Sequence, residues 1–154
     1  MQNQDVADIF KAMADILALQ EANAHRILAY RRAAERILAL DRPLAAVWRA
    51  GELRAIPGIG EVLAAKIDEL MRTGRLAAYE KLQAQVGAGV VEMMRVPGVG
   101  PKRAMRFWQE LGLESVAALA QAAREGRLQA LSGIGARTEA QILTAIEALE
   151  AGKN

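Results

Sequence analysis

The sequence predicts an all-α fold divided into two small helical subdomains. Apolar residues recur at helical spacing in almost every segment of the 154-residue chain, and no segment shows the sustained polar and apolar alternation of a strand. Glycine and proline fall between these segments, where they end helices. A short glycine-containing pattern occurs three times, each time before an amphipathic segment. These observations favour helices that are joined by tight turns.

The amino-terminal part begins with two predicted helices. The second covers about residues 24–40 and ends before Pro43, because proline cannot continue the helical hydrogen-bond ladder. Pro43 suits the first turn of a short helix that runs to Arg49 and stops at Gly51. The first helix covers about residues 6–19, and its apolar positions form a stripe for burial: Val6, Ile9, Phe10, Met13, Ile16 and Leu17.

Three further helices follow the glycine patterns. We expect the helix after Gly60 to end at Gly74 and the helix after Gly100 to end at Gly112, because glycine readily adopts the left-handed conformation at a helix C-terminus. The last helix is expected over about residues 137–149. Residues 86–89, Val-Gly-Ala-Gly, have the composition of a linker. We therefore predict subdomains at residues 1–86 and 90–150.

The repeated segments share the pattern apolar, Pro or Ser, Gly, apolar, Gly. They are Ile56-Pro57-Gly58-Ile59-Gly60, Val96-Pro97-Gly98-Val99-Gly100 and Leu131-Ser132-Gly133-Ile134-Gly135. Glycine permits a tight turn and the close approach of another backbone, and the middle residue is expected to point inward. The following helix presents unpaired N–H groups, which bind an anionic oxygen such as that of a phosphate. One copy would more simply be a turn, but three copies favour phosphate binding.

Composition and charge restrict the class of protein. The net charge is only +2, so it gives no argument for nucleic acid, but residues 95–106 carry four cations and no acid. The chain has no cysteine, which excludes a disulfide framework and a cysteine-liganded zinc. Nothing resembles a signal peptide or a membrane span of roughly 20 apolar residues. We therefore expect a cytoplasmic protein with no membrane partner.

The three repeated segments resemble helix-hairpin-helix motifs, which bind the DNA backbone without sequence preference. Residues 4–149 also resemble, in order, the amino-terminal region of family X DNA polymerases, particularly bacterial members. The resemblance implies that the partner is gapped, nicked or 5′-phosphorylated DNA, gripped downstream by the first half and at the primer-side duplex by the second. We also expect a monomer. The matching landmarks are residues 7–10, 26–34, 56–60, 65–70, 73–76 and 96–102.

The catalytic domains of that family have no counterpart in this sequence. The clustered aspartates of the polymerase palm, which bind Mg²⁺, do not follow Leu149, and neither do the histidines and acids of the bacterial nuclease domain. The chain alone is therefore not expected to polymerise DNA. Whether it is a fragment or a stand-alone binder stays open, as does a third class of function, a protein-interaction scaffold.

The second hairpin carries the strongest local positive charge. Lys102 and Arg103 lie in the first turn after Gly100, and Arg106 lies one turn later. A solvated helix face is the alternative interpretation. We predict that this hairpin binds phosphate through Gly98, Val99, Gly100, Lys102, Arg103 and Arg106.

The other two hairpins have weaker electrostatic support. The first, with Gly58, Ile59 and Gly60, is followed by Glu61, which suits a helix N-terminus. Its role in DNA binding therefore depends mainly on the resemblance. The third has candidate DNA-binding residues Gly133, Gly135 and Arg137, but the nearby Glu139 favours a structural role.

The resemblance assigns a 5′-phosphate site to His25, Arg26 and Tyr30. The simpler alternatives are an incidental histidine, a core tyrosine whose hydroxyl lies at the edge, and an ordinary surface ion pair between Arg31 and Glu35. Val62 stands where the family supplies another lysine, so this pocket is weaker than in the animal repair enzymes.

Lys66 matches the family lysine that forms a Schiff base with the aldehyde of a 5′-deoxyribose phosphate. That chemistry needs an unprotonated amine, and hence desolvation or nearby cations. The alternative is a surface lysine beside Asp68 and Glu69. Val62 and Ala78 replace lysines that support the reaction elsewhere, so enzyme activity stays uncertain.

Metals and aromatic residues add two further expectations. By resemblance, the carbonyl groups of Ile56 and Val96 would bind a monovalent cation, K⁺ or Na⁺, although DNA binding requires no cofactor. Trp48, Phe107 and Trp108 are expected to pack in the core rather than to stack on bases.

Overall fold

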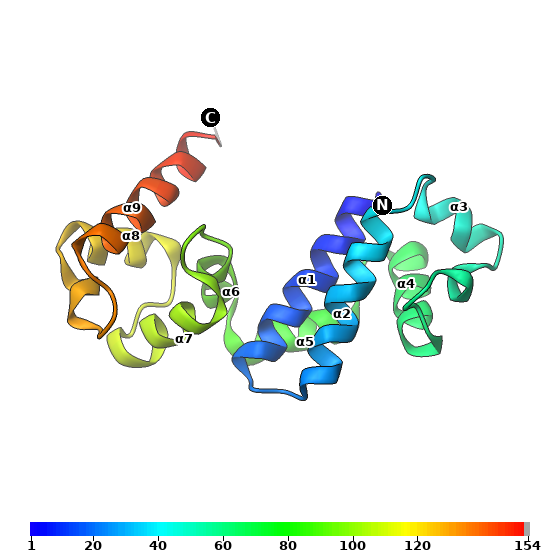
Figure 1. The fold of residues 1–154 in the computed structure, drawn as a ribbon, viewed down its shortest axis with the longest axis horizontal. Helices are drawn as coiled ribbons and strands as arrows, with labels where there is room; N and C mark the ends of the chain where they lie inside the picture. The colour runs from blue at the N-terminus through cyan, green and yellow to red at the C-terminus, as the bar shows by residue number, and fades with distance from the viewer. Residues whose placement is uncertain (153–154) are drawn as a thin grey trace. The chain divides into compact units, whose positions relative to one another are not determined.

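The structure is a computed structural model that describes residues 1–152, and it is all-α (Figure 1). Helices account for 74% of the chain and the described range contains no strand, which confirms the predicted fold class. No helix within that range is long and apolar enough to cross a membrane. The chain forms two compact units, Met1–Leu82 and the part from Gln83 onward, which are described separately.

The first unit is built on a pair of helices, α1 (Asn3–Leu19) and α2 (Ala24–Leu38), which lie side by side in Figure 1. Phe10 and Tyr30 meet edge to face in its core, with ring centroids 5.6 Å apart. The unit continues through α3 (Leu44–Arg49), the short 3₁₀ helix η1 (Leu53–Ala55) and α4 (Glu61–Thr73). Helix α5 (Ala77–Val86) crosses the division between the units.

The start of α1 lies three residues before the predicted position. The Gln2 backbone N–H donates to the Asp5 carboxylate over 2.8 Å, which forms a capping box at the helix N-terminus. Asn3 then holds the start of α3, because its side-chain oxygen accepts from the Leu44 backbone N–H over 2.7 Å. These polar contacts do not follow the apolar periodicity, so the stripe alone could not place this end of the helix.

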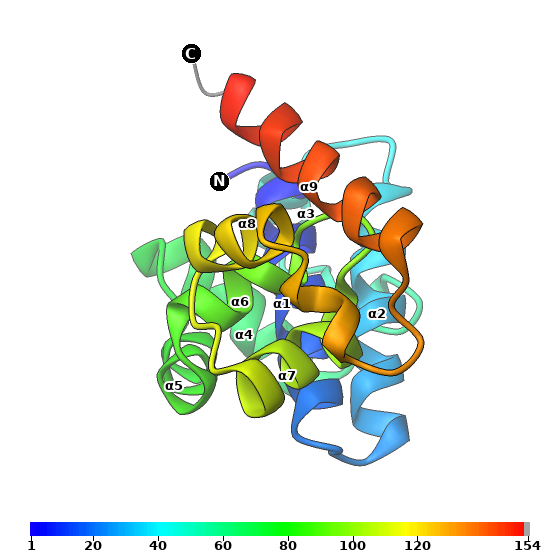
Figure 2. The same cartoon turned by 90° about the vertical axis from the view of Figure 1, so that its left-hand side faces the viewer.

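The second unit surrounds a core that includes Phe107, Leu119 and Ile146, all fully buried. Figure 2 shows how its helices cross. Gly112 ends α7 in the left-handed conformation with φ +67°, and Gly74 ends α4 in the same way, as predicted. The elements of this unit are α6 (Ala88–Met94), α7 (Gly100–Leu111), α8 (Val116–Arg124), the 3₁₀ helix η2 (Arg127–Ala130) and α9 (Ala136–Ala151).

The glycine-rich segment at residues 86–89 is not a linker throughout. Ala88 and Gly89 belong to α6. A Cβ on Gly89 would overlap the carbonyl oxygen of Glu114, so a side chain is excluded there by close packing. Only Gly87, with φ +84°, lies between α5 and α6. Composition alone cannot distinguish a glycine that packs from one that bends the chain.

Candidate nucleic-acid interface

The three hairpins share one backbone turn. The carbonyl oxygens of Ile56, Val96 and Leu131 accept hydrogen bonds from N–H groups three residues later, over 3.0, 3.0 and 3.2 Å. The glycine at the third position of each turn has φ between +84° and +91°, as in a type II turn. The residue after it is buried in all three cases, as predicted: Ile59, Val99 and Ile134.

The first and third hairpins continue into their helices in the same way. Gly60 and Gly135 are extended, with φ of −91° and −93°, and they cap α4 and α9. The first helical hydrogen bonds run from Ala64 to Gly60 and from Glu139 to Gly135. The three intervening N–H groups of each helix therefore have no intrahelical partner. The second hairpin differs, because α7 already begins at Gly100, whose φ is +65°.

A pocket of about 380 Å³ joins the first hairpin to α2. Arg26 and Tyr30 line it from α2, opposite Gly58, Gly60 and Val62. Burial raises the pKa of Tyr30, and the charge and side-chain hydrogen bond of Arg26 partly oppose this shift. Two of the three residues predicted for a 5′-phosphate therefore lie together beside a helix N-terminus.

The third predicted phosphate residue, His25, lies outside this pocket. It is exposed in the first turn of α2, where its backbone N–H is capped by the Asn23 side chain over 2.8 Å. Arg36 approaches the first hairpin instead, because an ideal Cβ on Gly58 would be 3.9 Å from its Cγ atom. Sequence reasoning missed Arg36 as a neighbour of the hairpin, since this contact depends on how α2 packs.

The alternative interpretation of Arg31 and Glu35 as a surface ion pair is wrong. The Arg31 guanidinium binds the Asp15 carboxylate of α1 over 3.0 Å. The side-by-side packing of α1 and α2 offers a partner that helical spacing within α2 cannot indicate. Tyr30 is 4% exposed, so it is a core tyrosine that also lines the pocket.

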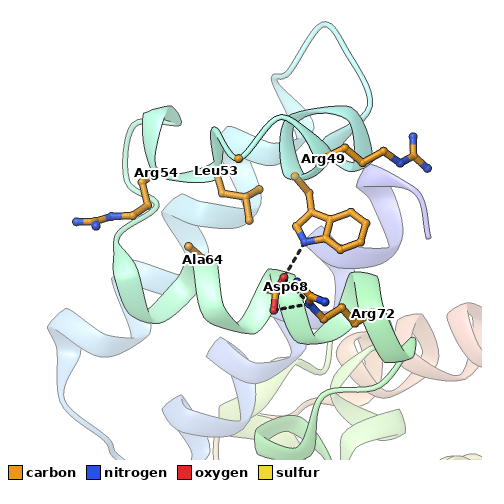
Figure 3. A pocket seen from close by; sticks show the side chains of 8 residues that line it. Arg49, Leu53, Arg54, Ala64, Asp68 and Arg72 are labelled. Carbon is orange, nitrogen blue, oxygen red and sulfur yellow. Dashed lines mark hydrogen bonds and ion pairs between the residues drawn. The ribbon is translucent and has the colours of Figure 1, made fainter.

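Lys66 lies on the flank of α4 that carries Val62, one helical turn away. Asp68 lies on the other flank, where its carboxylate accepts from Trp48 Nε1 over 2.8 Å and from Arg72 Nε over 2.9 Å (Figure 3). The Glu69 carboxylate accepts from the Ala77 backbone N–H over 2.7 Å. Neither acid pairs with Lys66, whose side chain makes no hydrogen bond or ion pair with other residues in the range 1–152.

The flank that carries Asp68 borders a different pocket, of about 500 Å³. Trp48 lines this pocket, and Figure 3 shows that the side chains of Arg49 and Arg54 point away from it. Trp48 is half-buried rather than fully packed in the core, whereas Phe107 is fully buried as expected. The indole N–H is already occupied by Asp68.

Two of the three cations predicted at the second hairpin bind protein atoms of the second unit. Arg103 Nη1 donates to the Gly98 carbonyl oxygen over 2.6 Å. Arg106 donates to the Glu110 carboxylate and to Ser132 of the third hairpin. The Lys102 side chain is exposed and makes no ion pair or hydrogen bond with the rest of the described chain.

The third hairpin combines an exposed cation with a buried acid. Glu139 is 6% exposed, and its two carboxylate oxygens accept from the Leu128 backbone N–H over 2.9 Å and from the Gln129 side chain over 2.7 Å. This acid therefore fixes η2 against α9. Arg137 is exposed at the same position after the hairpin as Lys102.

Comparisons with known proteins assign the family. Residues 1–76 match the helix-hairpin-helix domain, and residues 90–148 match the SAM-like helix-hairpin-helix tandem. The chain is a helix-hairpin-helix protein. Helix-hairpin-helix domains indicate that the chain binds DNA, as the resemblance predicted.

The helix-hairpin-helix chain is also similar to a polymerase. It is 29% identical over 153 residues to the DNA polymerase/3'-5' exonuclease PolX of Bacillus subtilis (strain 168). The match covers 99% of this chain and 26% of the relative, so the chain spans about a quarter of that protein, at its amino-terminal part. This similarity confirms the predicted resemblance to bacterial family X polymerases.

Proposed function

We propose that the chain binds the sugar-phosphate backbone of gapped or nicked DNA and serves as the substrate-gripping part of a family X repair polymerase. One observation carries the proposal. Arg26 and Tyr30 meet the first hairpin at a single pocket, beside the unpaired N–H groups at the start of α4. A cation, a hydroxyl group and a helix N-terminus together suit a terminal 5′-phosphate.

The remaining hairpins would bind duplex phosphates near that end. Lys102 and Arg137 are exposed cations, each located two residues after the second glycine of its hairpin. Lysine, arginine and backbone N–H groups all donate to phosphate oxygens, which are the same for every base. The binding should therefore be independent of base sequence and should weaken steeply with salt.

The test compares gapped DNA that carries a 5′-phosphate with the same DNA that carries a 5′-hydroxyl, at several salt concentrations. We expect tighter binding of the phosphate form, and we expect Arg26→Gln to reduce that preference by about tenfold, since it removes one charge-assisted contact. Arg32→Gln is the matched control, because Arg32 is an exposed arginine of α2 that does not line the pocket. Equal binding of gapped and intact duplex would refute gap recognition, and no DNA binding at low salt would favour a protein scaffold.

A 5′-deoxyribose-phosphate lyase is the second candidate function. It is favoured by the position of Lys66, one turn from Val62 at the pocket and without an ion pair in the described part of the chain. The Lys66 amine would attack the sugar aldehyde and release water to form an imine. Loss of a C2′ proton would then expel the 3′-phosphate.

Borohydride trapping on a 5′-deoxyribose-phosphate substrate tests this activity. The wild-type chain should form a covalent adduct, and Lys66→Ala should form none. Lys11→Ala, which removes an exposed lysine of α1 outside the pocket, should leave trapping intact. An unchanged adduct in Lys66→Ala would assign the chemistry to another amine.

A monovalent cation at the first two hairpins belongs to the same proposal. The carbonyl oxygens of Ile56 and Val96 each accept one hydrogen bond within the turn, so a second lone pair is left for K⁺ or Na⁺. Such an ion would bridge hairpin and phosphate. Replacing K⁺ by a tetraalkylammonium ion at constant ionic strength should then weaken DNA binding, and an unchanged affinity would refute the ion.

A further inference from the structure

The second and third hairpins pack reciprocally. The turn of the second hairpin lies against the helix that follows the third, because an ideal Cβ on Gly98 would be 3.8 Å from Ile142 Cγ1. The turn of the third hairpin is tied to the helix that follows the second, through Arg106 of α7 and Ser132. Each turn is therefore held by the helix of the other hairpin.

Arg106 makes the polar half of this arrangement. Its Nη1 atom donates to the Ser132 carbonyl oxygen over 2.9 Å, and its Nη2 atom lies 3.4 Å from the Ser132 hydroxyl. Its Nε atom donates to Glu110 over 2.9 Å, which fixes the guanidinium along α7. Three of the five guanidinium N–H groups are thus directed at protein atoms, and the side chain is 30% exposed.

We propose that Arg106 is a positioning residue that holds the third hairpin in register with the second, so that Arg137 and Lys102 contact the same DNA backbone. This inference rests on the proposed backbone binding. Ser132 lies in the turn of the third hairpin, and Arg137 lies in the first turn of α9, directly after this hairpin. A shift of the hairpin turn therefore moves Arg137 with it. Arg106 acts through Ser132 rather than through a phosphate.

A lysine could not replace Arg106 in this role. Its ammonium group is a single point, whereas the planar guanidinium donates toward Ser132 and Glu110 in different directions. The Arg106→Lys variant therefore keeps the charge and loses the geometry. It separates positioning from direct phosphate contact.

The experiment measures the salt dependence of duplex binding for the full chain and its variants. Each phosphate contact contributes a slope of about −0.9 in log K against log salt. Arg137→Gln should reduce the magnitude of the slope by about 0.9, and so should Arg106→Gln and Arg106→Lys, because each disengages Arg137. The double variant Arg106→Gln/Arg137→Gln should lose no more than either single variant.

Additive losses in the double variant would overturn the proposal, since they would mean that Arg106 contacts a phosphate itself. Retention of the wild-type slope by Arg106→Lys would overturn it for the same reason. Glu110→Gln, which weakens one anchor of Arg106, should give an intermediate loss. If wild-type binding had no salt dependence, or if Lys102→Gln left it unchanged, the proposed function itself would fail rather than the role of Arg106.

Discussion

Val62, Lys102 and Arg137 occupy the same position after the three hairpins, two residues beyond the second glycine. Lysine and arginine at this position direct a positive charge to the helix N-terminus, where a phosphate would lie. Val62 is 67% exposed and adds no charge. The cations near the first hairpin come from α2 instead, where Arg26 lines the pocket and Arg36 lies beside Gly58.

Introducing a cation at this position should strengthen the first hairpin. We expect Val62→Lys to bind 5′-phosphorylated gapped DNA about tenfold more tightly at low salt and to raise the magnitude of the salt slope by about 0.9. The fold should tolerate the change, since Val62 packs little. Val62→Gln is the control, and an equal gain in that uncharged variant would contradict a phosphate contact.

Asp68 links the pH to the stability of the first unit. Hydrogen bonds from Trp48 and Arg72 lower its pKa, so the folded state favours the carboxylate. The resulting stabilisation is present above the ordinary aspartate pKa of about 4, and it is lost as the pH falls through the lowered folded value.

Denaturant unfolding at several pH values checks this contribution. Asp68→Asn should be less stable than wild type at neutral pH, and the difference should shrink as the pH falls below about 4. Asp41→Asn replaces an exposed aspartate with no ion pair or hydrogen bond elsewhere in residues 1–152, so its stability profile should follow the wild type. A constant difference at every pH would assign the effect to packing.

At the scale of elements, sequence predicts helix ends and hairpin turns better than it predicts the partners of charged side chains. The C-termini at Gly74 and Gly112 and the turns at Gly58, Gly98 and Gly133 are confirmed, because glycine with positive φ is a local requirement. The partners of three arginines could not be predicted from sequence. Arg31 binds a carboxylate of the neighbouring helix α1, and Arg103 and Arg106 donate to backbone carbonyl oxygens of hairpin turns.

Gly89 gives the clearest test of element packing. A Cβ at this position would overlap the Glu114 carbonyl oxygen, so Gly89→Ala should destabilise the second unit by about 3 kcal/mol, as overpacking does. Gly135→Ala is the matched control, because Gly135 has φ −93° and open space around its Cα. Thermal unfolding measures both, and equal stability of the two variants would contradict the close approach.

At the scale of the whole molecule, each unit carries at least one hairpin of the same design. The family and the class of ligand could be predicted from these motifs, because a repeated local pattern can be recognised in the sequence alone. The pocket of Arg26 and Tyr30 could be found only in the structure, because it joins residues of α2 to a hairpin about thirty residues later in the chain. Base-independent binding is a property that the hairpins would confer together.

The salt slope of binding to two gapped DNAs of unrelated sequence tests that claim most directly, when it is measured for the wild type and for Lys102→Gln. We predict the same steep slope on both DNAs and a loss of about 0.9 in its magnitude in the variant, again on both. A wild-type slope near zero, or an affinity that depends on base sequence, would contradict backbone binding through the hairpins.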